Sequence, residues 1–199
     1  MSETYNPISG NDPFALFQQW FAEAQQKEIN DPNAMSLATA DESGISVRIV
    51  LLKGLDARGF TFYTNTQSRK GKQLKAHAKA GLCFHWKSLR RQVRVEGLIE
   101  PVTEDEADAY FRTRPRGSQI GAWASLQSEN LESRAALEAR LREFEKKFEG
   151  QDVPRPPHWS GFRLLPEMIE FWQDMPHRLH DRLIFRKEGK AWAQGRVYP

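Results

Sequence analysis

The chain of 199 residues contains a single cysteine, Cys83, and this scarcity limits its chemistry. One cysteine excludes both an intrachain disulfide and a zinc site built from several thiolates. No apolar run approaches the roughly 20 residues of a membrane-spanning helix. The first ten residues have neither the basic nor the apolar segment of a secretory signal. We therefore expect a cytoplasmic protein that binds neither a membrane nor a metal ion.

The sequence also lacks the short motifs of several common enzyme folds. It contains neither GxGxxG nor GxxxxGK[ST], which argues against a dinucleotide-binding Rossmann unit and a P-loop. The GxSxG turn of the α/β-hydrolases is missing as well. Cys83 lies in an apolar alternating run, where a buried packing role is more common than a nucleophilic one.

Acidic residues are missing from one long stretch of the chain. Between Ala57 and Val95 there is no Asp or Glu, whereas Lys and Arg together occur 10 times. The rest of the chain carries 19 basic and 26 acidic residues, so the net charge of +3 conceals a strongly basic segment. This segregation favours an anionic partner such as phosphate or nucleic acid. A solvated basic helix that binds nothing is the alternative.

Short alternating runs between turn signals predict antiparallel strands. The runs cover residues 35–39, 45–53, 60–64, 82–86, 93–99, 168–172 and 182–186. Capping residues predict helices after Asp12, Ser68 and Thr103, and Gly150 is expected to end a fourth helix. Strands in this number with few helices predict an α+β protein that is mainly β, with peripheral helices around a closed or nearly closed barrel.

Two basic clusters suit the binding of phosphate groups. Ser68, Arg69 and Lys70 stand at a predicted helix N-terminus, whose free amides attract anions and whose dipole opposes two cations. The second cluster surrounds Pro115 and contains Tyr110, Arg112, Arg114, Arg116 and Ser118. Either cluster could instead be ordinary surface charge. Two phosphate sites on a small barrel would suit a phosphorylated cofactor and a phosphorylated substrate.

A third group of residues combines an aromatic ring, a guanidinium and an imidazole. Trp172 can stack on a planar ring, and Arg178 can cover a π face or hold an anion. His180 can exchange a proton near neutral pH. A barrel strand with its tryptophan in the core and its charges in solvent would give the same pattern.

The segment IEFWQDMPHRLHDR, residues 169–182, resembles the C-terminal signature of the pyridoxamine 5'-phosphate oxidases. Further matching segments occur in the family's order: RIVLLK (48–53), FYTN (62–65), SRK (68–70), RRQVRVEG (90–97), YFRTRPRGSQIGAWAS (110–125) and PPHWSGFR (156–163). The resemblance covers about residues 12–199. It implies one FMN-binding split β-barrel domain over 1–199, with 1–11 a flexible arm and the signature on strands within 161–199. It also implies a homodimer with FMN at the subunit interface.

The resemblance implies a role for individual residues. FMN would be bound, partly from the partner subunit, by Arg48, Ile49, Val50, Leu51, Leu52, Lys53, Tyr63, Thr64, Ser68, Arg69, Lys70, Gln92, Gln127, Ser128, Trp172 and Arg182. The substrate phosphate would be bound by Lys53, Tyr110, Arg114 and Ser118. Arg178 and His180 would form the catalytic pair that contacts the substrate near its reacting carbon.

The family's reaction is the oxidation of pyridoxamine 5'-phosphate or pyridoxine 5'-phosphate to pyridoxal 5'-phosphate (EC 1.4.3.5). In this reaction O2 is reduced to H2O2, and the product serves vitamin B6 salvage and biosynthesis. Many members close an N-terminal arm bearing Arg and Tyr over the substrate. The 11 residues before Asp12 contain Tyr5 but no Arg or Lys, so we assign this arm no role.

Two other functions are compatible with parts of the pattern. The chain could be a different FMN oxidoreductase on the same barrel, such as a flavin reductase. It could also be a barrel that binds nucleic acid through its basic segment and its aromatic residues. A bound flavin in the purified protein would separate the second alternative from the other two functions.

Overall fold

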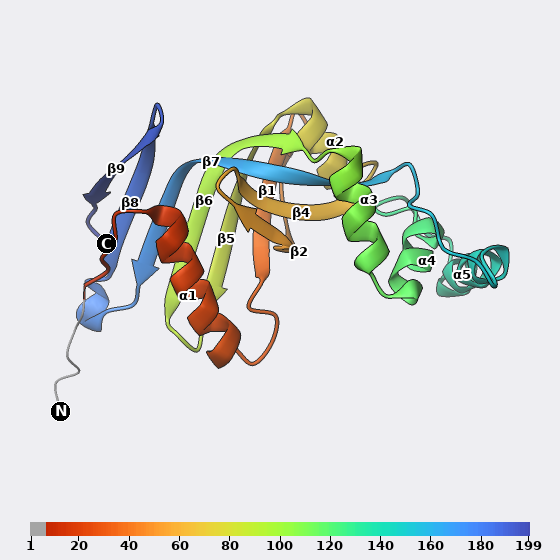
Figure 1. The fold of residues 1–199 in the computed structure, drawn as a ribbon, viewed down its shortest axis with the longest axis horizontal. Helices are drawn as coiled ribbons and strands as arrows, with labels where there is room; N and C mark the ends of the chain where they lie inside the picture. The colour runs from red at the N-terminus through yellow and green to blue at the C-terminus, as the bar shows by residue number, and fades with distance from the viewer. Residues whose placement is uncertain (1–6) are drawn as a thin grey trace.

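A computed structural model describes residues 7–199, which form a mainly antiparallel β-sheet with helices around it (Figure 1). The helices are α1 (Pro13–Lys27), α2 (Arg69–Ala76), α3 (Glu104–Thr113), α4 (Arg116–Ala124), α5 (Arg134–Lys147) and the 3-10 turn η1 (Pro176–Arg178). The strands are β1 (Ala34–Asp41), β2 (Gly44–Leu51), β3 (Gly54–Asp56), β4 (Gly59–Asn65), β5 (Lys79–Trp86), β6 (Arg91–Pro101), β7 (Trp159–Gln173), β8 (Asp181–Glu188) and β9 (Ala191–Arg196). No helix in this part of the chain is long and apolar enough to span a membrane.

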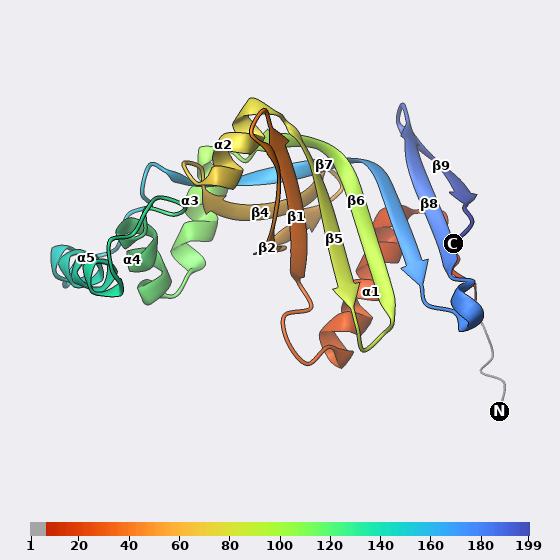
Figure 2. The same cartoon turned by 180° about the vertical axis from the view of Figure 1, so that it is seen from behind.

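Strand β7 pairs with three other strands, β4, β6 and β8. The strands pair in the order β2-β1-β5-β6-β7-β4-β3, and β8 and β9 extend the sheet beside β7. One edge of β7 pairs with β6 along its length, whereas the other edge pairs first with β4 and then with β8. The first half of β7 therefore lies between β6 and β4, and its second half lies between β6 and β8. The hairpin of β8 and β9 extends the sheet at that end (Figure 2).

A bulge divides these two halves of β7. Glu96 pairs with Met168 and Gly97 with Pro166, so Glu167 is the extra residue on β7. Proline lacks the amide hydrogen that a strand donates, and a bulge is one of the few interior positions that tolerates it. The backbones approach so closely that a Cβ on Gly97 would lie 2.0 Å from the Leu165 carbonyl oxygen. A larger residue than glycine at position 97 would force the strands apart.

Helix α1 seals the inner face of the sheet. Asp12 caps the helix by accepting from the Phe14 backbone N–H at 2.8 Å, as its sequence predicts. The buried Phe17 ring packs edge-on against Phe60 and Phe84, with centroids 4.9 and 5.0 Å away, and Trp20 packs on Phe171. Helix α1 thus joins β4, β5 and β7 into one core.

The predicted α+β, mainly β architecture is confirmed, but some elements differ. Strands β3 and β9 were not predicted, because both are short edge strands of the sheet. Residues 116–124 form α4, although the sequence indicated only a basic cluster around Pro115 and no helix there. Strand β7 begins at Trp159 and not near Met168, because the bulge accommodates Pro166 where the pattern indicated a break. The predicted caps Ser68 and Thr103 are in place at α2 and α3.

The predicted flexible arm over 1–11 lies partly outside the described residues, which begin at 7. Within the described part, Ile8 is buried. Its backbone N–H donates to Asp181 at 2.8 Å, and its carbonyl accepts from Arg196 at 2.6 Å. The chain just before α1 is therefore held against β8 and β9. The extent of an arm, and the division of the chain into domains, stay predictions.

Ion pairs anchor α3 to the barrel. Glu106 completes the capping box with Thr103 and also accepts from Arg163 of β7 at 2.6 Å and from Arg58 at 2.9 Å. Arg163 is only 4% exposed, so its charge is stabilised mainly by Glu106 and Glu100. The Thr103 backbone N–H and the two arginines lower the pKa of Glu106 to about 2.

We predict that Glu106→Gln lowers the free energy of unfolding at pH 7 by about 1–3 kcal/mol, because charge-assisted hydrogen bonds are lost. The folded-state pKa lies below the unfolded value of 4.5, so the carboxylate contributes fully above that pH. Its contribution is lost as the pH falls toward 2. Urea unfolding followed by tryptophan fluorescence should show the wild type and the variant converging over this range.

Asp105→Asn is the matched control, since Asp105 is exposed in the same helical turn. It should change the free energy of unfolding by less than about 0.5 kcal/mol. A difference between wild type and Glu106→Gln that stays constant from pH 7 to pH 2 would contradict the assignment.

Candidate active site

The principal candidate site is a cavity of about 490 Å³ between strands β2 and β4. These strands lie near opposite ends of the pairing order and form no ladder with each other in the described chain. Helices α3 and α4 complete the wall. The volume lies within the roughly 300–1,000 Å³ of small-molecule sites. The lining residues are Ile49, Val50, Leu51, Lys53, Tyr63, Thr64, Asn65, Lys70, Tyr110, Arg114, Ser118, Gly121, Ala122, Ser125, Gln127 and Trp159.

Lys70 places a buried cation at one end of this cavity. Its side chain leaves the first turn of α2, and the residue is 8% exposed. The ammonium donates to Thr64 at 3.2 Å and to Gln127 at 3.1 Å, and no carboxylate in the described chain pairs with it. Burial and the nearby charge of Arg48 lower its pKa. A buried cation with only neutral partners is suited to receive an anion.

Arg114 brings a second cation to the cavity from the C-terminal end of α3. Its Nη1 atom is buried without a hydrogen-bond partner, one of two such side-chain atoms within residues 7–199. No carboxylate in that range forms a salt bridge with it, and burial lowers its pKa. Tyr110 and Ser118 line the same end of the cavity. The structure thus brings these three residues to one cavity, and their binding of a substrate phosphate stays a prediction.

Aromatic rings form the wall between the two cations. Tyr63 stacks on Tyr110 with centroids 4.1 Å apart and an interplanar angle of 14°. Trp159 is nearly parallel to Tyr63, at 5.4 Å and 4°. The Arg114 guanidinium lies over the Trp159 ring, 4.7 Å from its centroid. Burial is the main cause that raises the pKa of the Tyr63 hydroxyl.

A second group of predicted site residues lies on β6, β7 and β8 and on the turn before β8. Gln92, Trp172 and Arg182 occupy one row across β6, β7 and β8, because Gln92 pairs with Trp172 and Trp172 with Arg182. The Trp172 and His180 rings are 4.6 Å apart. Arg178 is exposed on the adjoining turn and has a positive φ of 63°. Such a conformation is strained for a residue other than glycine and concentrates at functional sites.

His180 is held by its own turn. Its Nδ1 atom lies 3.0 Å from an Asp174 carboxylate oxygen and 3.2 Å from the Met175 backbone nitrogen. Asp174 in turn forms an ion pair with Arg90, and its N–H donates to the Arg90 carbonyl at 3.0 Å. These contacts engage Nδ1 and leave Nε2 as the nitrogen available to a ligand.

The two groups do not meet within one chain. The cavity lies beside α3 and α4, whereas β8 and η1 lie at the far end of the molecule in both views (Figures 1 and 2). None of Gln92, Trp172, Arg178, His180 or Arg182 lines the cavity. A site containing all the predicted residues would need a second copy of the chain.

An exposed apolar row lies next to the cavity. Ile45, Val47 and Ile49 of β2 are 77%, 63% and 62% exposed, and Leu51 continues the row. Their cross-strand neighbours on β1 are small, since Val47 pairs with Ala38 and Ile49 with Ser36. A contiguous apolar strand face of this kind is typical of a protein–protein interface.

Some predicted FMN residues lie beside the cavity but do not line it. Arg48 turns toward β1 and α2, where it donates to Thr39 and to the Leu37 carbonyl, and Ser68 caps α2. Leu52 is buried in the barrel core, whereas Arg69 and Ser128 are exposed. The predicted roles of these five residues stay predictions, as do those of the predicted residues that line the cavity.

Conversely, the cavity includes residues for which the sequence indicated no role: Asn65, Gly121, Ala122, Ser125 and Trp159. Trp159 lies in the PPHWSGFR segment, where an aromatic residue after a proline-rich connector was the one available signal. The side chain's contact with Arg114 depends on the fold and not on sequence spacing.

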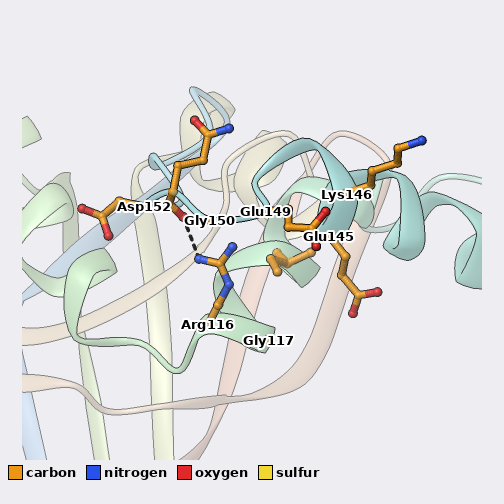
Figure 3. Close-up of a pocket in the computed structure, with 9 residues that line it drawn as sticks. Arg116, Gly117, Glu145, Lys146, Glu149, Gly150 and Asp152 are labelled. Carbon is orange, nitrogen blue, oxygen red and sulfur yellow. Dashed lines mark hydrogen bonds between the residues drawn. The ribbon is translucent and has the colours of Figure 1, made fainter.

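The basic cluster around Pro115 divides in the structure. Arg114 faces the cavity, but Arg116 points the other way into a separate hollow beside the end of α5 (Figure 3). There it donates to the Gln151 carbonyl at 2.8 Å and to the Phe148 carbonyl. These bonds satisfy acceptors just beyond α5, so Arg116 has a structural role. Arg112 is exposed.

Comparisons with known proteins identify the family. The family model described as pyridoxamine 5'-phosphate oxidase matches residues 21–148. A second model, the pyridoxine 5'-phosphate oxidase C-terminal dimerisation region, matches residues 159–199. The chain is 58% identical to the pyridoxine/pyridoxamine 5'-phosphate oxidase of Azorhizobium caulinodans, covering 99% of this chain and 97% of that protein. It is 60% identical to the Caulobacter vibrioides oxidase of the same name, covering 96% and 87%.

Solved structures agree with this assignment. The structure of PhzG from Burkholderia lata, in complex with tetrahydrophenazine-1-carboxylic acid, has a TM-score of 0.90 and 34% identity, covering 96% of this chain and 94% of that one. An FMN-binding, pyridoxamine 5'-phosphate oxidase-related protein from Nostoc punctiforme shares the fold, with a TM-score of 0.75 at 14% identity over 96% and 100% of the chains. The split-barrel fold is thereby confirmed, and the chain belongs to the pyridoxamine 5'-phosphate oxidase family.

Proposed function

We propose that this chain is an FMN-dependent oxidase that converts pyridoxamine 5'-phosphate or pyridoxine 5'-phosphate to pyridoxal 5'-phosphate. The observation that carries the proposal is a pair of cations in one aromatic-walled cavity: the buried Lys70, and the half-buried Arg114 with its buried, unpartnered Nη1 atom. Neither has a carboxylate partner in the described chain. Two phosphate-bearing ligands would supply the missing charge at both ends. A cytoplasmic location stays a prediction from composition.

The residues of the cavity fit FMN. A phosphate beside Lys70 would also meet the N-terminus of α2, where the helix dipole favours an anion. The apolar side chains of Ile49, Val50 and Leu51 can border a planar ring system. Gln127 can act with Lys70, since their side chains already share a hydrogen bond of 3.1 Å.

The substrate would bind at the other end of the same cavity. Arg114, Tyr110 and Ser118 would hold its phosphate, and Lys53 lines the same cavity. Binding energy from the remote phosphate can hold the reacting carbon in place, which is a proximity effect. Bound FMN would supply the acceptor for a hydride from that carbon and would return to its oxidised form by reducing O2 to H2O2.

The catalytic pair would come from the partner subunit. The guanidinium of Arg178 can cover the substrate ring or hold its charge, and His180 can exchange a proton through Nε2. Gln92, Trp172 and Arg182 lie in the same surface row and would complete the FMN site. The apolar face of β2 next to the cavity supports an interface there. The match to a dimerisation region over 159–199 supports the same arrangement.

The other functions receive less support. Nucleic-acid binding would need the basic segment to form a continuous cationic face. Instead Lys70 is buried in the cavity, Arg91 pairs with Glu23, and Lys72 pairs with Glu129. A flavin reductase has no need of a second phosphate subsite, so Arg114, which has no salt bridge in the described chain, favours a phosphorylated substrate over an unphosphorylated one.

The direct test is an assay of the purified protein. We expect flavin absorbance that chromatography identifies as FMN, and production of H2O2 when pyridoxine 5'-phosphate and O2 are supplied. Unphosphorylated pyridoxine is the matched control substrate and should react far less efficiently, because it lacks the group that Arg114 would bind. A colourless protein that takes up no FMN, or equal kcat/KM for both compounds, would refute the proposal.

Two substitutions should separate the two phosphate subsites. A charge-assisted hydrogen bond contributes about 1.5–3 kcal/mol, which corresponds to roughly 10- to 150-fold in affinity. Lys70→Met should therefore weaken FMN binding by such a factor, yield pale protein and regain activity when FMN is added. Arg114→Met should stay yellow and show a raised KM for pyridoxine 5'-phosphate.

Lys72→Met is the control for Lys70→Met, because Lys72 lies on the same helix with 63% of its side chain exposed. It should leave both FMN affinity and KM unchanged. If Arg114→Met loses flavin while Lys70→Met retains it and loses substrate affinity, the two subsites are assigned the wrong way round.

A further inference from the structure

The cation of Arg114 is oriented by aromatic rings and not by a counter-ion. In the described chain its guanidinium has no salt bridge, and Nη1 has no hydrogen-bond partner. Its neighbours are the Trp159 ring at 4.7 Å and the Phe111 ring at 5.5 Å from the guanidinium carbon. A long, flexible side chain held in this way keeps its donor atoms free for a ligand.

Trp159 is itself held rigidly. It begins β7 and pairs with Asn65 of β4, and the residue is 6% exposed. Its backbone N–H donates to the Pro156 carbonyl at 2.9 Å, and its carbonyl accepts from Arg155 at 2.7 Å. Phe111 packs edge-on against the indole, with centroids 5.0 Å apart. The indole face presented to Arg114 is therefore fixed by the sheet.

The same ring connects the two subsites of the cavity. Trp159 lies parallel to Tyr63, which the resemblance assigns to FMN, and to Tyr110, which it assigns to the substrate phosphate. Tyrosine and arginine thus both pack on one indole at the centre of the cavity wall. An interaction between a cation and a desolvated aromatic face is among the stronger contacts of this type.

We propose that Trp159 is a positioning residue for the substrate phosphate, and that its indole face holds the Arg114 guanidinium where its free N–H groups can receive that phosphate. This inference rests on the proposed function, since it deepens the role of Arg114. It assigns Trp159 no contact with the reacting atoms. A purely structural role, as one more buried aromatic ring, is the competing explanation.

The test compares Trp159→Leu and Trp159→Phe with the wild-type holoenzyme. Loss of the cation–π contact in Trp159→Leu should raise the KM for pyridoxine 5'-phosphate about 5- to 30-fold. Trp159→Phe keeps a weaker π face and should give an intermediate KM. The kcat per bound FMN should change less than KM. A structural role would instead reduce the amount of active, flavin-loaded protein and leave its KM unchanged.

Coupling to Arg114 gives the decisive comparison. In an Arg114→Met background, Trp159→Leu should change KM by less than about twofold, because the cation that it orients is gone. Trp123→Leu is the matched control, since Trp123 also packs near a cation, Lys147, outside the cavity. It should leave KM unchanged. Should the leucine variant fail to fold, the KM of Trp159→Phe decides, and an unchanged value would overturn the inference.

Calorimetry with inorganic phosphate separates this inference from the proposed function, because it requires no turnover. The wild-type holoprotein should bind phosphate, and Trp159→Leu should bind it about 5- to 30-fold more weakly. If the wild type binds phosphate but does not oxidise pyridoxine 5'-phosphate, the function fails and this ratio still decides the role of Trp159. Equal phosphate affinity in the two proteins, or none in the wild type, would overturn the inference.

Discussion

The pairing of β7 constrains the rest of the molecule. The edge of β7 that does not pair with β6 pairs with β4 along its first half and with β8 along its second half. The bulge opposite Gly97 lies between these two partners. Because of this division, β4 can form one wall of the cavity while β8 carries Arg182 at the other end of the molecule (Figure 1). The close approach of backbones at Gly97 makes the division a local steric requirement. The separation of β4 from β8, and thus of the cavity from the β6–β8 row, follows from it.

Electrostatics then distinguishes the cavity from the remaining charged surface. Burying a cation without a compensating anion costs several kcal/mol. In the described chain the barrel tolerates this at Lys70 and, in part, at the half-buried Arg114, whose Nη1 atom is buried without a partner. Elsewhere, buried charges have partners: Arg163 has two carboxylates, and Glu170 has Arg94 and Arg182. The contrast between compensated and uncompensated charge is what favours phosphate-bearing ligands in the cavity.

Local signals in the sequence predicted much of the fold, and long-range contacts account for the differences. The caps at Asp12, Ser68 and Thr103 depend on residues next to them, so their sequence was sufficient. Pro166 depends on a bulge formed with β6, which no local pattern reveals. Likewise, the sequence could not tell that Arg114 enters the cavity whereas Arg116 bonds to carbonyls beyond α5, since that choice is made by packing. Which predicted site residues line the cavity and which lie on β6–β8 also became clear only from the strand pairing of the sheet.

The central claim is that a complete site combines the cavity of one subunit with the β6–β8 row of its partner. It is tested most directly by dissociating and reassociating a mixture of Lys70→Met and Trp172→Leu proteins, each of which should bind FMN poorly alone. Random reassociation should restore about a quarter of the sites in flavin binding and oxidase activity, since only mixed dimers contain an intact pair. A mixture that shows no more FMN binding than its two components would contradict the account.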